Sequence, residues 1–145
     1  MIHLFNAKTP KNDLITFKGE YILDNICSKG IITEELNGEY SFEGIFRISN
    51  SKDKKAYDLL IEDSLLKIDD EYGEEYFRIA SIDKTKYEIE VYARHITISD
   101  ILTMWCEDVR PENQNGNGAI NWIFDNAKGV INFQVSSNIS EVSTA

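Results

Sequence analysis

The sequence contains little cysteine or proline and no long apolar run. Two prolines in 145 residues leave no proline-rich linker. Cys27 and Cys106 stand in neither a CxxC pair nor any metal-binding spacing, so we expect two free thiols with structural roles. No run of about 18 apolar residues occurs, so no membrane-spanning helix is predicted. The apolar run near Met1 is too short for a signal peptide, which predicts synthesis and folding in the cytoplasm.

Positive charge is also scarce. The chain has 15 Lys and Arg against 25 Asp and Glu, a net charge of −10 at pH 7. Binding to nucleic-acid phosphates or to an anionic bilayer would begin against long-range repulsion, so neither partner is expected. Hydrophobic residues make up 42% of the chain, with seven Phe, seven Tyr and two Trp, which is enough for a core. The length allows one domain, or one domain and the beginning of a second.

The pattern of residues 87–105 changes from that of a strand to that of a helix. Its first half alternates between apolar and polar side chains, the period of a half-buried β-strand. From Ile98 onward, apolar residues recur at spacings of three and four, with Ser99 placed as the N-cap. We therefore expect a strand that turns sharply into a helix ending near Glu107, with Trp105 on the apolar face.

Residues 30–48 have the pattern of a β-hairpin around Asn37 and Gly38. Asn-Gly is the preferred pair for a two-residue type I′ turn, because both positions need a positive φ. A two-residue loop would pair Thr33 with Phe42. The predicted core face of this hairpin then consists of Ile31, Thr33, Tyr40, Phe42, Phe46 and Ile48.

The remaining segments add strands before the helix and a mixed segment after it. A second hairpin is expected from strands at 76–83 and from Tyr87, with a turn at 84–86. Apolar residues at 14–17 and 21–26 do not separate strand from helix, and 56–68 fits one bent strand or two short elements. Further expectations are a first strand at 1–5, a helix at 119–128 capped by Asn117, and a strand at 130–135.

Three segments together resemble a known family. They are residues 34–43 (EELNGEYSFE), 76–79 (YFRI) and 91–96 (VYARHI), which occur in this order in the N-terminal region of phage minor structural proteins. That family includes prophage endopeptidase tail and tail-associated lysin proteins. The similarity covers the chain from about residue 31 through the helix near Ile120. Because family members are usually much longer, the chain resembles an N-terminal fragment.

The resemblance implies a baseplate hub protein at the tip of the phage tail, located in the virion and made in the host cytoplasm. Such hubs are similar to a fold in which β-barrel domains of three subunits form a ring that continues the tail tube. The implied fold is α+β and β-rich: a barrel-like hub domain at 1–97, then two short helices and a strand at 98–145 that begin a second domain. Implied partners are further copies in a homotrimer, the distal tail or tube protein, and fibre or lysin modules.

Two other functions stay open beside the hub. One is a peptidoglycan endopeptidase whose catalytic part lies outside this chain, and the other is a module that binds carbohydrate on the host surface. Both tryptophans, Trp105 and Trp122, are expected in the core, which disfavours the second. The 145 residues contain no recognisable catalytic constellation, so the chain itself is predicted not to be an enzyme and to need no cofactor.

Candidate catalytic and metal-binding residues are weak throughout. His3 and His95 have no partners at ligand spacing, and His95 is expected to be packed, with its nitrogens satisfied by the backbone. A nucleophile pair of Cys106 and His95 is disfavoured because the two fall on different elements without an oxyanion-type glycine motif. The acidic segment 69–75 lacks the order of a calcium loop and is predicted to be a solvated turn. The glutamates beside the Asn-Gly turn are interpreted as solubilising.

One candidate surface is a subunit interface. Tyr92, Arg94 and Ile96 alternate with the core residues of the strand at 87–96 and so lie on its opposite face. Tyr and Arg are enriched in buried contact patches, which makes these three residues the predicted interface. The same residues could equally support a second layer of the same subunit.

Overall fold

The computed structural model of this chain describes residues 1–7, 9, 19–69, 71, 73–99, 103, 105–106, 110–128 and 137–140. The chain divides into two compact units, Met1–Ser99 and Asp100–Ala145. The predicted strand at 130–135 and the apolar segment at 14–17 lie outside the described residues. The predicted boundary between domains at residue 97 stays a prediction.

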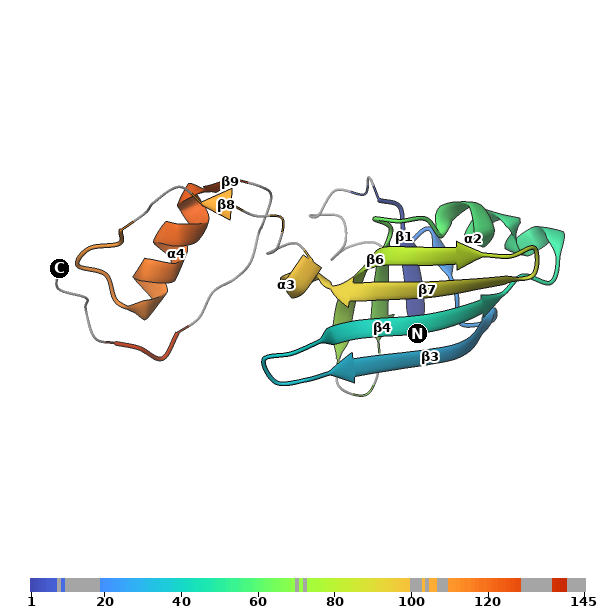
Figure 1. The fold of residues 1–145 in the computed structure, drawn as a ribbon, viewed down its shortest axis with the longest axis horizontal. Coiled ribbons are helices and arrows are strands. Elements are labelled where there is room, and N and C mark those ends of the chain that lie inside the picture. The colour runs from blue at the N-terminus through green and yellow to red at the C-terminus, as the bar shows by residue number, and fades with distance from the viewer. Residues whose placement is uncertain are drawn as a thin grey trace. The chain divides into compact units, whose positions relative to one another are not determined.

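Seven strands of the first unit form one antiparallel sheet (Figure 1). Their order across the sheet is β2-β1-β5-β6-β7-β4-β3. The β-rich α+β class expected from the sequence is confirmed. The strands are β1 (Ile2–Phe5), β2 (Tyr21–Ile22), β3 (Cys27–Glu34), β4 (Tyr40–Arg47), β5 (Leu65–Asp69), β6 (Glu74–Lys84) and β7 (Glu88–His95).

The two edge strands, β2 and β3, follow each other directly in the sequence. The chain between Ile22 and Cys27 makes five Cα–Cα steps and therefore spans at most about 19 Å. A flat sheet of seven strands would hold its edges about 29 Å apart, at about 4.8 Å for each gap between strands. The sheet therefore has to curl, and it forms a half-barrel (Figure 1).

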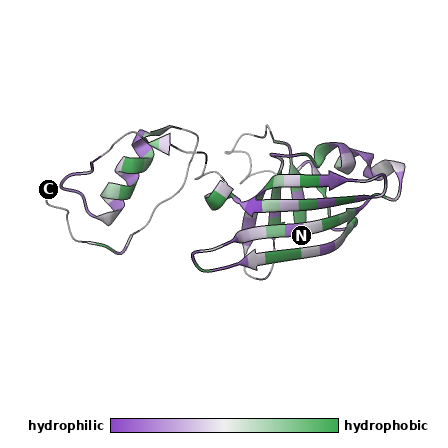
Figure 2. Cartoon of the chain, in the orientation of Figure 1, coloured by the Kyte–Doolittle hydropathy of each residue, from purple (hydrophilic) through white to green (hydrophobic). Residues whose placement is uncertain are grey.

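The concave face of the half-barrel holds the core. The main buried cluster joins residues from both halves of the sheet, which only the concave face can do. Helix α2 (Lys54–Leu59) adds Ala56 to this cluster. Figure 2 shows the apolar and polar residues alternating along the strands, as expected when one face is buried. The cluster consists of Leu4, Leu23, Ile26, Phe42, Phe46, Ala56, Leu60, Leu66, Ile68, Phe77, Ile79, Ile89, Val91 and Ala93.

Phe42 covers a pair of glycines within this core. Gly30 on β3 and Gly44 on β4 are directly paired across the two strands. A Cβ atom at Gly44 would lie 2.6 Å from Cε1 of Phe42 and 2.9 Å from Cε2 of Phe46. A Cβ atom at Gly30 would lie 3.2 Å from Cε2 of Phe42. The ring of Phe42 therefore occupies the space that a side chain at either position would need.

The β3–β4 hairpin forms where predicted, but its predicted register is wrong by one residue. Phe42 pairs with Ile32 rather than with Thr33. A type I′ turn needs a positive φ at both central residues, and of the Asn37-Gly38 pair only Asn37 has one, at 59°. The loop is one residue longer, closed by a hydrogen bond from the Gly38 amide to the Glu35 carbonyl oxygen (3.0 Å).

The one-residue difference exchanges the two faces of β3, as the two-residue period of a strand requires. Ile32 packs against the core, whereas the predicted core residue Ile31 is 42% exposed. The predictions for β4 hold, because Phe42 and Phe46 are buried there and Tyr40 packs against the core. The turn residues were therefore sufficient to locate the hairpin but not to align its strands.

The hairpin of β6 and β7 agrees with the prediction and contains one bulge. The register shifts between Ile79 and Ser81, so Ala80 is the extra residue on β6. Before the bulge Ile79 faces the core, and after it Ile82 does. A bulge is the physical reason why two isoleucines three positions apart both point inward in a strand.

The segment at 56–68, which fitted one bent strand or two short elements, forms two elements. The first is α2, preceded by a short 3₁₀ turn (Ser51–Asp53), and the second is β5. The carboxylate of Asp53 is buried and accepts hydrogen bonds from the amides of Ser49 (3.1 Å) and Asn50 (3.2 Å). These bonds fix the loop that leads from β4 into α2.

In the second unit, α4 (Gly116–Asn126) forms largely where predicted. Its N-cap is Asn115 rather than Asn117, because the Asn115 side chain accepts a hydrogen bond from the Gly118 amide (2.9 Å). The helix ends before β9 (Ala127–Lys128), which pairs with β8 (Trp105–Cys106). No helix in the described part of the chain is long and apolar enough to cross a membrane.

The predicted helix with Ser99 as its N-cap and its end near Glu107 is wrong in the described residues, because Ser99 is the last residue of a helix and residues 105–106 form a strand. Helix α3 (Ile96–Ser99) is short, and Trp105 lies in β8 with 56% of its surface exposed. Trp122 on α4 is 44% exposed, so the expectation that both tryptophans lie in the core is also wrong. An apolar stripe of four residues stabilises a helix only where tertiary packing buries it, and here a strand pair forms instead.

Candidate functional site

His95 joins three elements at the end of β7. Its Nε2 lies 2.8 Å from Oε2 of Glu75 on β6, and its Nδ1 lies 2.7 Å from Oγ1 of Thr97 on α3. The Thr97 amide also donates to Nδ1, at 3.3 Å. Because a backbone amide can only donate, Nδ1 is the unprotonated nitrogen, and Nε2–H donates to Glu75. Burial lowers the pKa of His95, and the hydrogen bond and charge of Glu75 oppose this shift.

Aromatic contacts hold the His95 ring in place. It stacks on Tyr40 with ring centres 4.3 Å apart and meets Phe77 edge to face at 5.3 Å. The order Thr97, His95, Glu75 resembles a nucleophile, base and acid, yet His95 lines neither the hollow beside Tyr92 and Glu43 nor the one beside Tyr92 and Arg94. His95 is therefore a packed histidine, as predicted, but side chains rather than the backbone supply its two short hydrogen bonds.

Tyr92 and Arg94 lie on the convex face, as predicted. The Tyr92 hydroxyl donates to Oε1 of Glu39 at 2.8 Å, and the guanidinium of Arg94 lies 5.8 Å from the centre of the Tyr92 ring. Hydrogen bonds from Ser41 and Tyr92, followed by the charge of Arg94, lower the pKa of Glu39. These contacts attach the base of the β3–β4 hairpin loop to β7.

Ile96, the third predicted interface residue, has a different environment. It packs with Tyr76 against Phe5 and Leu65, which form a small buried cluster separate from the main core. Ile96 therefore contacts residues of its own subunit, and the subunit interface stays a prediction. Tyr92 and Arg94 instead border a shallow hollow of about 260 Å³, which is lined by Gly38, Glu39, Tyr40, Tyr92, Arg94 and Ile98.

The remaining candidates from the sequence are the acidic segment and the two cysteines. Within the described residues, no group of three or more His, Cys, Asp or Glu side chains is placed to hold a metal ion. In the acidic segment, Glu74 pairs with Lys67 at 2.6 Å and Glu75 bonds to His95, so both carboxylates have structural partners rather than only solvent. Cys27 and Cys106 are free thiols, and burial raises the pKa of Cys27.

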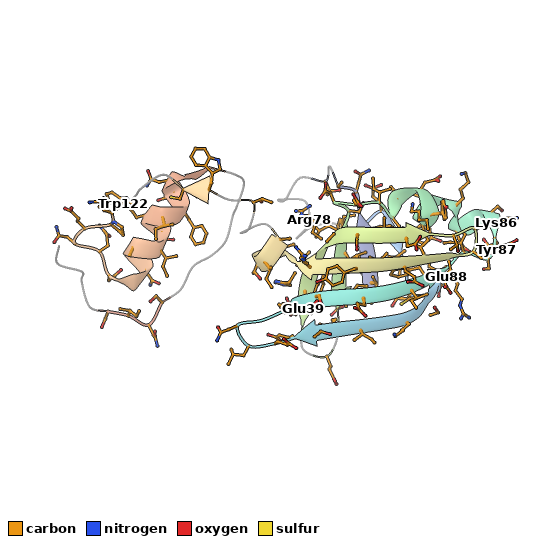
Figure 3. The ribbon with its side chains drawn as sticks, viewed as in Figure 1. Glu39, Arg78, Lys86, Tyr87, Glu88 and Trp122 are labelled. Atoms are coloured by element: carbon orange, nitrogen blue, oxygen red, sulfur yellow. The ribbon has the colours of Figure 1, made fainter. Side chains whose placement is uncertain are left out.

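The two ends of the half-barrel carry different side chains. Figure 3 places Glu39 at one end of the strands and Lys86 and Tyr87 at the other. At the first end, the β3–β4 loop exposes its glutamates, and Leu36 at its tip is 96% exposed. We call this surface the hairpin tip; it consists of Glu34, Glu35, Leu36, Asn37, Gly38 and Glu39.

The opposite end is formed by the β6–β7 turn and the start of α2. Tyr87 is 65% exposed, with the ammonium of Lys86 5.1 Å from the centre of its ring. Lys84 points inward instead: it lies 4.5 Å from the Tyr57 ring, and burial lowers its pKa. We call this surface the basic end; it consists of Arg47, Lys54, Lys55, Lys86 and Tyr87.

No protein-family model, curated protein or solved structure matched this chain. The fold defines its class, a β-rich α+β protein built on a curled antiparallel half-barrel. The difference in charge between the hairpin tip and the basic end could not be read from local sequence patterns, because the residues of these two surfaces come from four separate segments of the chain.

Proposed function

We propose that this chain is the N-terminal part of a phage or prophage tail hub protein. It assembles as a ring, as a homotrimer, and connects the tail tube to host-recognition or lysin modules. The observation that carries the proposal is the placement of the three segments that resemble this family. They fall on the β3–β4 hairpin, β6 and β7, which are consecutive neighbours in the sheet order β6-β7-β4-β3. The resemblance thus belongs to one continuous surface of the half-barrel rather than to scattered strands.

The mechanism is assembly rather than chemistry. A half-barrel leaves its edge strands with unpaired backbone groups, and β3 is an edge strand of eight residues. Contacts between subunits cover such edges, and a closed ring repeats each contact around the symmetry axis. The proposed partners are copies of the chain and the neighbouring tail proteins, and no cofactor takes part.

The experiment that tests this function locates the protein in particles. Antibodies raised against the chain would be applied to phage-like particles from the source culture and seen with gold-labelled secondary antibody by electron microscopy. Label at the tail tip is expected, and antibody pre-absorbed with the purified chain is the control. Particles that carry no specific label, or label on the capsid, would refute the hub assignment.

A further inference from the structure

We infer that copies of this chain associate head to tail, with the hairpin tip of one copy bound to the basic end of the next. This inference specifies the subunit contact of the proposed ring and rests on that proposal. Four observations carry it: an exposed apolar anchor, a fixed loop conformation, opposite charge at the two ends, and the position of those ends on one rigid sheet.

Leu36 is the apolar anchor. It is 96% exposed, more than any other large hydrophobic residue in the described part of the chain. The turn needs a positive φ at Asn37 but has no geometric need for an apolar neighbour at Leu36. A leucine at the most exposed point of a loop is stabilised when a partner removes it from water.

The loop that presents Leu36 is held before any partner binds. Hydrogen bonds from the Glu35 amide to the Glu39 carbonyl oxygen (2.8 Å) and from the Gly38 amide to the Glu35 carbonyl oxygen (3.0 Å) close it. The Tyr92 hydroxyl holds the Glu39 carboxylate from the neighbouring strand. A loop already ordered loses less conformational entropy on binding, so more of the contact energy appears as affinity.

Charge selects the surface that receives the tip. In the described part of the chain, the carboxylates of Glu34 and Glu35 have no ion-pair partner, and neither does the ammonium of Lys86. Arg47 and Lys54 are paired with Glu88 and Asp58 at the protein surface, at 3.6 and 3.4 Å. In a chain of net charge −10, copies repel in most orientations, so the ammonium of Lys86 facing the carboxylates of Glu34 and Glu35 favours one orientation over the others.

Charge disfavours a symmetric pair of tips. Tip against tip would oppose the same glutamates of two copies, and like charges placed together oppose binding. The tip and the basic end lie at opposite ends of the strands (Figure 3), so each copy offers one donor surface and one acceptor surface. Such a heterologous contact closes into a ring when the rotation between copies allows closure. Tyr87, 65% exposed beside Lys86, provides the apolar surface for Leu36.

The test measures the mass of the full chain by sedimentation equilibrium and light scattering, at concentrations up to about 1 mM, where even millimolar affinity shows. The variants are Glu35→Lys at the tip and Lys86→Glu at the basic end, with Leu36→Ser as a neutral change of the anchor. Glu62→Lys is the matched control, because it makes the same charge change at an exposed position next to Asp63, whose amide bonds to the Ile79 carbonyl oxygen in the middle of β6.

We expect the native chain and Glu62→Lys to associate with the same affinity. Both should associate more weakly as the salt concentration rises, because the Debye screening length shortens from about 10 Å at 0.1 M to about 3 Å at 1 M. Each of the three variants should weaken association at least tenfold. An equal mixture of Glu35→Lys and Lys86→Glu should regain association, since each acidic surface again meets a basic one. The mixture favours even-numbered assemblies, because alternating copies cannot complete a three-membered ring.

A monomeric native chain would overturn the head-to-tail contact, and so would variants that associate as well as Glu62→Lys. Neither result bears on the hub assignment, which the gold-labelling experiment tests independently. If the native chain is a trimer and all three variants associate equally well, the ring uses another surface. If the mixture of Glu35→Lys and Lys86→Glu associates but no gold label appears at the tail tip, the head-to-tail contact is supported and the hub assignment is refuted.

Discussion

The substitution Gly44→Ala tests the packing of Phe42 over the glycine pair of β3 and β4. The added methyl group would lie 2.6 and 2.8 Å from Cε1 and Cζ of Phe42 and 2.9 Å from Cε2 of Phe46. Both rings are buried, at 2% and 0% exposure, so neither can turn aside freely. Overpacking of this kind costs about 1–3 kcal/mol. Replacing a glycine within a strand returns about 0.5–1 kcal/mol, so a net loss of about 1 kcal/mol is expected.

The matched control is Gly30→Ala, the same chemical change at the cross-strand partner. Its methyl group would lie 3.2 Å from Cε2 of Phe42, which a ring shift of a few tenths of an ångström relieves. The stability gained by replacing a strand glycine then offsets the cost of the close contact with Phe42. The free energy of unfolding should therefore stay within about 0.5 kcal/mol of the native value. Urea denaturation followed by circular dichroism measures both variants.

A Gly44→Ala variant as stable as the native chain, or a Gly30→Ala variant that loses as much stability, would contradict this packing of Phe42. A second check combines Gly44→Ala with Phe42→Leu, which removes the ring edge that the methyl group would meet. The two substitutions should then be coupled by about 0.5–3 kcal/mol, the range found for residues in direct contact. Additive effects would place the cost of Gly44→Ala somewhere other than Phe42.

Three further outcomes are expected. Ile32→Ala should lower the free energy of unfolding by about 1–2 kcal/mol and Ile31→Ala by less than about 0.5 kcal/mol, and the reverse order would favour the register predicted from the turn. The pKa of His95 in the folded chain lies below its ordinary value of about 6.5, so the unfolded chain takes up the proton first as pH falls. The neutral ring therefore contributes its full stability above about pH 6.5, and this contribution is lost as pH falls from there through the folded pKa. Urea titrations at several pH values should therefore show the difference between the native chain and His95→Gln shrinking in acid, and a constant difference would contradict this. A zymogram on bacterial cell wall should show no clearing by this chain, whereas clearing would support the endopeptidase alternative.

The sequence predicted the fold where hydrophobic periodicity and burial agree. The alternation in β7 and the turn at 84–86 were enough to place the β6–β7 hairpin. The register of β3 was missed because Asn-Gly suits more than one loop length, and a one-residue change reverses every side chain. The helix expected to reach Glu107 was missed because four apolar residues at helical spacing do not reveal whether anything will bury them.

The candidate site was predicted only in part, for a related reason. Tyr92 and Arg94 were placed on the convex face by alternation alone. The partners of His95 could not be found, because Glu75 is brought to it by the pairing of β6 with β7, 20 residues away in the sequence. The hairpin tip was recognised as an exposed acidic turn, but its relation to Lys86 depends on the strand order, which local patterns do not contain.

The order of strands also bears on how quickly the half-barrel can fold. The turn between β6 and β7 closes over three residues, whereas Phe5 on β1 pairs with Leu65 on β5, 60 residues later. Closing the longer loop costs about 2–3 kcal/mol more chain entropy, at about 0.6 kcal/mol for each doubling of length. The local hairpins β3–β4 and β6–β7 are therefore expected to form first, and the pairing of β1 with β5 to come later. The short link at 23–26 then ties the late strands to an edge that is already built, so amides of β1 should acquire protection from hydrogen exchange after those of β7.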